Sequence, residues 1–381
     1  MIPSGGHPFR VCRVKSGRLV SSTDLVALTL EPMPNEEHAP LGVSYVIPVL
    51  NEVAYIETAI RTVLEQDYSG PTELILALGP SSDGTTELVQ RLVETDASII
   101  VVHNPATDIP VGLNLAIRAS SHPVIVRVDA HSELDPSYTR RAVETLVRTG
   151  AANVGGVMKA LGKTPFQSAV ARAYNSRFGL GGGSYHGGAA EGPAESAYLG
   201  VLRREVLDEV KLFDESVRRG EDWELNLRIR NAGHLVWFDP SLEVTYWPRE
   251  SWPKLVRQFA ATGIWRGELV RRYPDRSPWR FFAPPVLVAT IALSIVVLAV
   301  QLTGALRGWP SAVLSLIYFG PAAYMLLLLL ICFSRAGGPG WSDRWRFFLV
   351  LPTMHVSWGV GFIVGLVRGA RDTVDTSRTG I

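Results

Sequence analysis

The chain has 381 residues, a length that favours about two or three domain-sized units. With 37 basic and 36 acidic side chains its formal net charge is +1, so no global basic field indicates binding to nucleic acid. The mean hydropathy of +0.15 is high for a soluble enzyme. The two cysteines, Cys12 and Cys332, lie in a polar leader and in an apolar run, which argues against a disulfide framework.

Residues 1–40 form a polar leader of mixed composition. The leader has no apolar core of the length that a signal peptide requires, and we expect it to be a disordered arm. Met33 stands shortly before the first predicted strand and offers an alternative start of the chain.

Strands and helices alternate through residues 41–250. Short apolar runs rich in β-branched residues predict strands, and apolar residues at helical spacing predict the helices between them. This alternation predicts parallel βαβ units and a Rossmann-like, mostly parallel sheet in an α/β domain. The first four predicted strands span 43–50, 73–78, 98–104 and 123–131, and the helices after the first three begin near 56, 86 and 112.

Polar residues follow three of these strands at the points where the strands end. They lie at 48–52, 79–83 and 129–131. Ligands of parallel α/β sheets bind beyond the carboxyl ends of the strands, so we expect these three segments to share one binding cleft. The fold by itself does not select the ligand.

Asp129 and His131 end the fourth predicted strand. Residues two apart on a strand face the same way, so both side chains are expected to reach one ion. A carboxylate oxygen and an imidazole nitrogen suit Mn²⁺ or Mg²⁺ held by a diphosphate, where the ion would act as a Lewis acid. The alternative is an Asp and a His that cap a loop.

Three further acidic residues, Asp83, Glu221 and Asp222, each fit a functional role and a purely structural role. Asp83 lies in a tight Ser-Ser-Asp-Gly turn, where it binds a ligand or forms an Asx-turn that stabilises the loop. Glu221 and Asp222 follow Gly220 at the start of a predicted helix, a position that acidic side chains favour because of the helix dipole. A carboxylate here would also serve as general base toward a hydroxyl group, and Asp222 is our candidate.

Residues 181–188, GGGSYHGG, form a glycine-rich loop. The loop lacks a directly preceding strand and a GK[ST] ending, so it is a poor match to a phosphate-binding loop. A mobile loop over a cleft and a plain connector both fit this stretch.

Residues 251–280 carry a basic, amphipathic helix. Its tryptophans and arginines suit a membrane interface, with apolar parts among the headgroups and charges toward anionic lipid. Gln258, Trp265 and Arg266 lie on this helix, where they bind a ligand or are ordinary interface residues.

Residues 281–370 form an apolar region that predicts transmembrane helices. The stretches 281–306 and 308–334 contain no charged residue, and in 347–367 only His355 could carry charge. A bilayer core takes about 20 apolar residues in a helix, so the first two stretches are predicted spans. The third contains a proline and several glycines, and it could span, re-enter or lie against the others.

Arginines set the expected orientation. Five of them crowd just before the first predicted span, one lies in the first loop and three lie in the second loop. The positive-inside rule therefore places the N-terminal domain and the second loop in the cytoplasm. Three spans would put the tail, 371–381, outside, yet this end of the chain holds Arg368, Arg371 and Arg378, so two or three spans remain open.

Four motifs together resemble glycosyltransferase family 2, whose members have the inverting GT-A fold. They are VSYVIPVLNE, PSSDGT, VRVDAH and GEDWELNLR, in this order over about residues 43–240. A closer likeness is to succinoglycan-type membrane glucosyltransferases. These share the DAH form in place of DxD, a glycine-rich stretch like FGLGGGSYHGG, a Q-x₆-W-R segment, here 258–266, and C-terminal membrane helices.

The resemblance implies donor-binding roles for two loops. Pro48, Asn51 and Glu52 match the first donor-binding loop, and Asp83 matches the acidic residue of the second. Many relatives carry an acidic pair just before the second loop, and one of these acids contacts the nucleotide base. Residues 78–79 are Leu and Gly here, so a carboxylate partner for a uracil N–H is missing and base selectivity is open.

The resemblance also implies the reacting centre. Asp129 and His131 match the site of the metal ion, Mn²⁺ or Mg²⁺, and of the diphosphate. Asp222 matches the general base, with Glu221 beside it. Gln258, Trp265 and Arg266 resemble the family's motif on the acceptor and diphosphate side.

The leading interpretation is an inverting transferase in the plasma membrane (the inner membrane of a cell with two). It would move a sugar from a nucleotide-sugar, with UDP-hexose expected, to a lipid-linked or cell-surface glycan acceptor. A polyprenyl-phosphate sugar synthase is the alternative enzyme, and a degenerate transferase acting as a membrane scaffold is the alternative without activity. A processive synthase is not favoured, because the segment after Gln258 lacks Q-x-x-R-W spacing.

Overall fold

The computed structural model describes residues 39–180, 190–305 and 307–370. The predicted leader as far as residue 38, the glycine-rich loop at 181–188 and the tail at 371–381 therefore lie outside the described residues. The predictions made for these three segments stay predictions.

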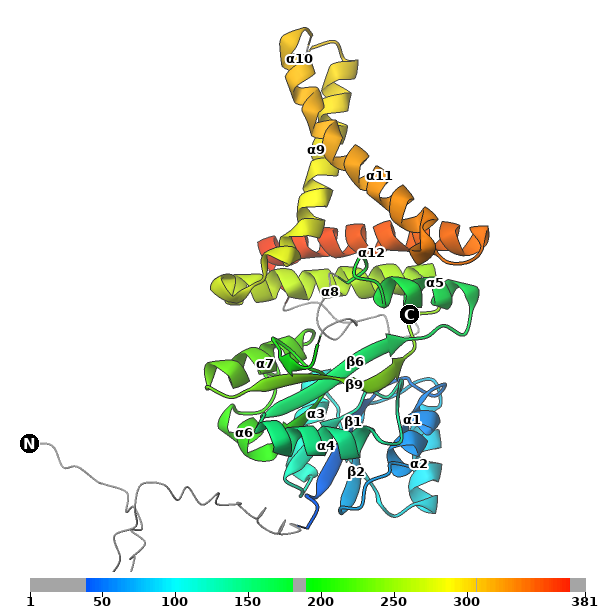
Figure 1. Ribbon diagram of the computed structural model, residues 1–381, viewed down its shortest axis with the longest axis vertical. Coiled ribbons are helices and arrows are strands. Elements are labelled where there is room, and N and C mark those ends of the chain that lie inside the picture. Colours follow the sequence, from blue (N-terminus) through cyan, green and yellow to red (C-terminus); the bar gives the residue numbers. More distant parts are fainter. Residues whose placement is uncertain (1–38, 181–189, 306, 371–381) are drawn as a thin grey trace, which may run out of the picture. The chain divides into compact units, whose positions relative to one another are not determined.

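A mixed sheet of nine strands, counted over the described residues, forms the N-terminal domain (Figure 1). Its order is β3-β2-β1-β4-β8-β6-β9-β5, with β7 paired to β9. Strands β1 to β4 pair in parallel, and β8 joins β4 to β6 by antiparallel pairing. The predicted α/β class and its parallel βαβ units are confirmed. The strands are β1 Val43–Val49, β2 Thr72–Leu78, β3 Ile99–His103, β4 Val124–Arg127, β5 Ser132–Leu134, β6 Asn153–Ala160, β7 Gly192–Pro193, β8 Tyr198–Arg203 and β9 Val236–Tyr246.

Helices cover both faces of this sheet, because its central strands are apolar on both sides. In β1, Tyr45 and Ile47 belong to an apolar cluster with side chains of α1, α2 and α4, while Val46 between them belongs to a second cluster with side chains of α3, α6 and α7. This arrangement is typical of buried parallel strands. The helices of the domain are α1 Ile56–Leu64, α2 Thr85–Thr95, α3 Ile109–Ala119, α4 Tyr138–Thr149, α5 Pro165–Tyr174, α6 Arg204–Glu209 and α7 Glu221–Asn231.

One of the predicted strands differs from the structure. The strand predicted at 123–131 ends at Arg127, so Asp129 and His131 lie beyond β4, in the segment that leads to β5. Pro48 lies inside β1, opposite Ala77 of β2, as the strand predicted at 43–50 requires, so the match to the first donor-binding loop begins within the strand.

The C-terminal region begins with the predicted amphipathic helix. This helix, α8, lies alongside the last helix, α12, while α9 and α11 lead away from the pair (Figure 1). Short 3₁₀ turns connect α8 to α9. The bounds are α8 Trp252–Arg272, α9 Ala283–Leu302, α10 Trp309–Leu314, α11 Phe319–Phe333 and α12 Trp341–Arg368, with 3₁₀ turns η2 Pro274–Arg276, η3 Trp279–Phe282, η4 Ser315–Tyr318 and η5 Arg335–Gly337.

Glycines bring α8 and α12 into close contact. Gly263 and Gly267 of α8 face the backbone of α12, and Gly361 and Gly365 of α12 face the backbone of α8. A Cβ added at any of these four positions would collide with a carbonyl oxygen of the other helix. Small residues four apart let helix backbones approach in this way, so the two helices form one packed pair running in the same direction.

The described part of the chain contains three segments long and apolar enough to cross a membrane. They are Trp279–Leu302, Trp309–Phe333 and Trp341–Arg368. In the third, 39 % of the most apolar window is buried in the protein, against 17 % in each of the others. The difference arises because α12 packs against α5 and α8 through side chains such as Phe347 and Met354.

Candidate active site

The loops after β1 and β2 are tied together by hydrogen bonds. The side-chain oxygen of Asn51 accepts from the Ser82 amide at 2.8 Å, and the Asn51 amide donates to the Ser81 hydroxyl at 3.0 Å. The Glu52 amide donates to the Thr85 hydroxyl at 2.8 Å. Asn51 has a positive φ of 53°, a conformation that asparagine tolerates better than most residues. These bonds fix the two predicted donor-binding loops relative to each other.

Asp83 stabilises this pair of loops with both of its oxygens. Oδ1 accepts from the amide and the hydroxyl of Thr85, and Oδ2 accepts from the Val53 amide at 3.2 Å. Burial alone would raise the pKa of Asp83, but these hydrogen bonds hold it below its ordinary value. The Asx-turn interpretation of Asp83 thus describes its contacts in the structure, and its role in donor binding stays a prediction.

Glu52 and His131 connect the first loop to the segment after β4. Glu52 Oε1 lies 3.2 Å from His131 Nδ1, and both side chains are buried. The rings of His131 and Tyr246 are in T-shaped contact, with their centroids 5.4 Å apart. A small cavity of about 100 Å³ borders this pair, and it is lined by Asn51, Glu52, Tyr55, His131, Trp247, Pro248, Arg249, Glu250 and Lys254.

Arg127 gathers three of the predicted carboxylates around one buried guanidinium. Its side chain is 5 % exposed, and it pairs with Asp129 at 3.2 Å, with Glu221 at 3.0 Å and with Asp222. Burial disfavours the charged guanidinium, yet the carboxylates of Asp129 and Glu221 raise the pKa of Arg127 above its ordinary value. The cluster therefore joins the end of β4 to the start of α7.

Asp222 is the most open member of this cluster. Its side chain is 33 % exposed, against 14 % for Asp129 and 7 % for Glu221. Gly220, with φ of 81°, turns the chain so that both acids lie in the first turn of α7. A carboxylate that is held by a cation and still reaches solvent can accept a proton from an incoming group.

The sequence missed Arg127. The available signal was its position two residues before Asp129, at the last position of β4. Its carboxylate partners Glu221 and Asp222 lie 94 and 95 residues later in the chain, and no local sequence pattern predicts these pairs.

The strand geometry predicted for Asp129 and His131 is wrong, because both residues lie beyond the end of β4, while their role as metal ligands stays a prediction. Because β4 ends at Arg127, Asp129 is drawn to that arginine and His131 to Glu52. Across residues 39–180, 190–305 and 307–370, no group of three or more His, Cys, Asp or Glu side chains is placed to hold a metal ion.

The three predicted residues of α8 have different surroundings. Gln258 donates to the Tyr246 hydroxyl at 3.1 Å. Trp265 is buried in an apolar cluster with Trp223 and Leu269, which is a packing role. Arg266 stacks on aromatic rings, with its guanidinium carbon 5.3 Å from the Trp223 ring and 4.3 Å from that of Phe281. Of the three, Arg266 also lines a larger cavity.

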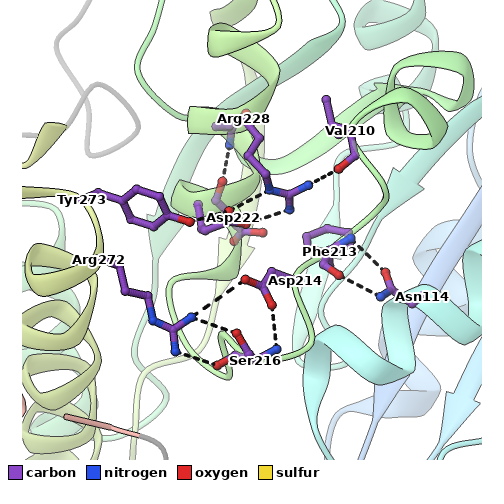
Figure 2. A network of polar contacts seen from close by, with 11 residues as sticks. Asn114, Val210, Phe213, Asp214, Ser216, Asp222, Arg228, Arg272 and Tyr273 are labelled. Atoms are coloured by element: carbon purple, nitrogen blue, oxygen red, sulfur yellow. Dashed lines mark hydrogen bonds and ion pairs between the residues drawn. The ribbon is translucent and has the colours of Figure 1, made fainter.

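A polar network fixes the segment that leads into α7 (Figure 2). Asn114 exchanges hydrogen bonds with the backbone of Phe213, and Arg272 of α8 donates to the Ser216 hydroxyl at 2.8 Å. Arg228 of α7 donates to the carbonyl of Val210. Hydrogen bonds from α3 and from α8 thereby fix the segment before α7, and they help to position Asp222 in the first turn of that helix.

Comparison with known proteins assigns a family to this arrangement. The model of the family described as glycosyl transferase family 2 matches residues 44–210. The succinoglycan biosynthesis protein ExoA of Rhizobium meliloti is 31 % identical over 238 residues, which cover 62 % of this chain and 72 % of that protein. A dolichyl N-acetyl-α-D-glucosaminyl phosphate 3-β-D-2,3-diacetamido-2,3-dideoxy-β-D-glucuronosyltransferase of Methanococcus voltae is 23 % identical over 341 residues, or 86 % of this chain and 98 % of that one.

A solved structure supports the fold. The mannosyltransferase PcManGT of Pyrobaculum calidifontis, solved with GDP-Man and Mn²⁺, superposes with a TM-score of 0.58 at 17 % identity, covering 87 % of this chain and 88 % of that one. The predicted GT-A fold and the predicted glycosyltransferase activity are confirmed. The chain belongs to glycosyltransferase family 2 and is a membrane glycosyltransferase.

Proposed function

We propose that the enzyme transfers a sugar, with inversion, from a nucleotide-sugar to a lipid-linked or cell-surface glycan acceptor. The Arg127 cluster carries this proposal, because it unites Asp129 and Asp222, the residues predicted for the diphosphate side and for the base. UDP-hexose is the proposed donor. The GDP-Man bound to the Pyrobaculum enzyme supports a nucleotide-sugar as donor. Residues 78 and 79 are Leu and Gly, so no carboxylate there selects the base of the nucleotide.

The proposed reaction needs a base on the acceptor side. The acceptor hydroxyl oxygen attacks the anomeric carbon, the bond from that carbon to the diphosphate oxygen breaks, and the nucleoside diphosphate leaves with the bonding electrons. Asp222 takes the hydroxyl proton. Arg127 pairs with the Asp222 carboxylate and orients it, and Glu221 shares the same guanidinium without facing solvent to the same extent.

A divalent ion fits the donor side of this site. Asp129 and His131 would hold the ion, because they offer the oxygen and nitrogen ligands that Mn²⁺ accepts. The Mn²⁺ in the Pyrobaculum complex supports this assignment, and Mg²⁺ is the other proposed ion. When bound, the ion would neutralise charge on the departing diphosphate.

The acceptor is proposed to be lipid-linked. The Methanococcus relative bears the name of a transferase that acts on a dolichyl-phosphate-linked sugar, and the apolar C-terminal helices of this chain provide a membrane surface. A polyprenyl-phosphate sugar synthase would instead use the lipid phosphate oxygen as nucleophile. The mass of the product separates the two, because only the first forms a bond between two sugars.

The membrane arrangement is proposed to have two crossings, with the catalytic domain in the cytoplasm of a plasma or inner membrane. Helix α8 carries charges such as Lys254, Arg271 and Arg272, which keeps it at the membrane surface. Because α12 packs along α8, it lies at the same depth and does not cross. Helix α9 and the α10–α11 segment then form a hairpin, and the basic end of the chain returns to the side of the catalytic domain.

A donor screen tests the proposed activity. The purified full-length enzyme is offered single nucleotide-sugars with Mn²⁺, and the release of each nucleoside diphosphate is measured. We expect release from a UDP-hexose above that from the other donors. The activity proposal fails if no nucleotide-sugar is turned over in the presence of membrane lipid extract as the source of acceptor.

A further inference from the structure

A second cavity, of about 580 Å³, lies between the catalytic domain and the C-terminal helices. Its volume is within the range of ligand-binding pockets. Its walls come from the segment after α5, from β8 and α8, and from α9, α11 and α12. None of the proposed donor-binding residues lines this cavity, although Arg266 of the predicted acceptor side does.

Three arginines form the charged part of the lining, namely Arg177, Arg266 and Arg280. Arg266 and Arg280 both stack on Phe281, with guanidinium carbons 4.3 Å and 5.4 Å from its ring. Arg177 stacks on Phe178, with its guanidinium carbon 4.9 Å from the ring. Stacked guanidinium groups keep their N–H edges directed outward, which suits two-point recognition of phosphate. One edge of Arg280 already donates to Glu195 at 2.9 Å, which leaves its other N–H groups for a ligand.

The remaining wall is apolar, and its polar side chains are already paired. Leu287 of α9 and Met354 and Trp358 of α12 line it. His355 lies 2.8 Å from the Phe178 carbonyl through Nε2 and 2.8 Å from the Tyr324 hydroxyl through Nδ1. A ligand that fills this part of the cavity therefore needs a hydrocarbon surface and few polar groups.

The cavity reaches toward the start of α7 from two sides. Thr262 lines it, and its hydroxyl accepts a hydrogen bond at 2.7 Å from Arg219, which lies three residues before Asp222. Arg266 lines it too and stacks on Trp223, the residue that follows Asp222 in α7. A group bound at the arginines is thus expected near the first turn of α7, which carries the proposed base.

We propose that this cavity binds the acceptor lipid, with a phosphate or diphosphate at the arginines and the first isoprenoid units along the apolar wall. This inference rests on the proposed function, in which the acceptor is lipid-linked. A single unsaturated chain with an anionic head matches one row of apolar side chains next to three guanidinium groups. The cavity selects the lipid phosphate, and the adjacent Asp222 acts on the sugar that this lipid carries.

Direct binding tests the site without any donor. The full-length protein is placed in nanodiscs of phosphatidylglycerol and phosphatidylethanolamine, and a photoactivatable polyisoprenyl diphosphate is crosslinked and mapped by mass spectrometry. We expect label on peptides of α9 and α12 that line the cavity. Unlabelled polyisoprenyl diphosphate should compete, whereas inorganic diphosphate and added phosphatidylglycerol should not.

Two variants address the two parts of the cavity. Arg177→Gln should weaken binding of the lipid about tenfold, the loss of one hydrogen bond to a charged group. Leu287→Trp should block labelling by filling the apolar part. The matched controls are Arg271→Gln, at another exposed arginine near the membrane, and Val286→Trp, at a position 60 % exposed beside Leu287, and both should bind as the wild type does.

Each outcome decides between sites and functions. Three results would overturn the assignment of the cavity as the lipid site. They are lipid binding by both Arg177→Gln and Leu287→Trp at the wild-type level, label outside the cavity, and competition by phosphatidylglycerol. Asp222→Asn should retain lipid binding while losing transfer. If nucleoside diphosphate release is normal and the lipid binds elsewhere, this inference fails and the proposed function stands, whereas lipid bound in the cavity without any turnover contradicts the function alone.

Discussion

The guanidinium of Arg127 donates a hydrogen bond to the carboxylate of Asp222, which lies 95 residues later in the chain. The same guanidinium pairs with Asp129 and Glu221. One buried cation thus compensates the charges of three carboxylates that would otherwise repel one another. Arg127 is therefore a positioning residue for Asp129, on the proposed diphosphate side, and for Asp222, the proposed base.

Replacing Arg127 should therefore cost both stability and activity. Arg127→Gln leaves the carboxylates without a cation, and removal of one partner from a buried ion pair costs about 3–5 kcal/mol. Thermal unfolding of the detergent-purified protein measures this loss. Arg127→Lys, which restores the charge, should recover part of the stability and part of the transfer rate.

The control for this experiment is Arg140→Gln. Arg140 pairs with Asp67 and Glu144 at the exposed surface, and such pairs contribute little to stability. Equal melting temperatures for Arg127→Gln and Arg140→Gln would contradict the role of the cluster.

Asp83 should give a pH-dependent contribution to stability. Its pKa in the folded protein lies below the ordinary value, so its ionised form is stabilised by folding. That stabilisation is present in full above the unfolded pKa of about 3.9 and is lost as pH falls through the folded pKa. Asp83→Ala should lower the melting temperature at pH 7, and the gap to the wild type should narrow at pH 3.5 and below. A gap that widens on acidification would be inconsistent with the hydrogen bonds to Thr85 and Val53.

Removal of divalent metal should stop transfer. Treatment with EDTA is expected to abolish nucleoside diphosphate release, and Mn²⁺ should restore it. Asp129→Asn and His131→Ala should each raise the Mn²⁺ concentration needed for half-maximal rate, while Glu133→Gln, on β5 beyond His131, should not. Full activity in EDTA would show that the cation at this site is supplied by the protein alone.

Close packing of α8 on α12 should tolerate no side chain at the shared glycines. Gly361→Leu or Gly365→Leu forces the helices apart, and overpacking of this kind costs about 1–3 kcal/mol or more. Val360→Leu, at a position 46 % exposed on the same helix, is the matched control. Comparison of the melting temperatures in detergent tests the pairing, which is wrong if all three variants melt alike.

Two crossings predict a specific labelling pattern in intact cells. In a background with Cys12→Ser and Cys332→Ser, Arg307→Cys between α9 and α10 should react with a membrane-impermeant maleimide. Ser342→Cys at the start of α12, and a cysteine appended after Ile381, should react only after lysis. Three crossings would instead expose the appended cysteine in intact cells.

Local pattern predicted the parts of the site that lie on short stretches of chain. The strand ends at Asn51, Glu52 and Asp83 follow from alternating apolar runs, and their loops are in contact as expected. The sequence missed Arg127 and the divergence of Asp129 from His131, because both depend on partners far along the chain and on where β4 stops.

Composition likewise could not distinguish a spanning helix from a packed one. The apolar stretch of α12 is long enough to cross a bilayer, and its protein partners become visible only in the fold, through the facing glycines of α8 and the buried side chains packed against α5. Trp265 fits an interface or acceptor residue by sequence, and its burial against Trp223 depends on the fold of α7. The elements β5, α4, β6 and α5 had no motif and were not predicted.

The transfer rate of Asp222→Asn tests most directly whether Asp222 is the general base. Asparagine keeps the shape and one acceptor oxygen for Arg127, so folding and nucleotide binding should be unchanged, whereas loss of the general base should lower the rate about 10²–10⁴-fold. The measurement is the initial rate of sugar transfer to lipid acceptor by the purified variant, beside its melting temperature and its affinity for UDP. A transfer rate equal to that of the wild type would contradict the assignment of Asp222 as the general base.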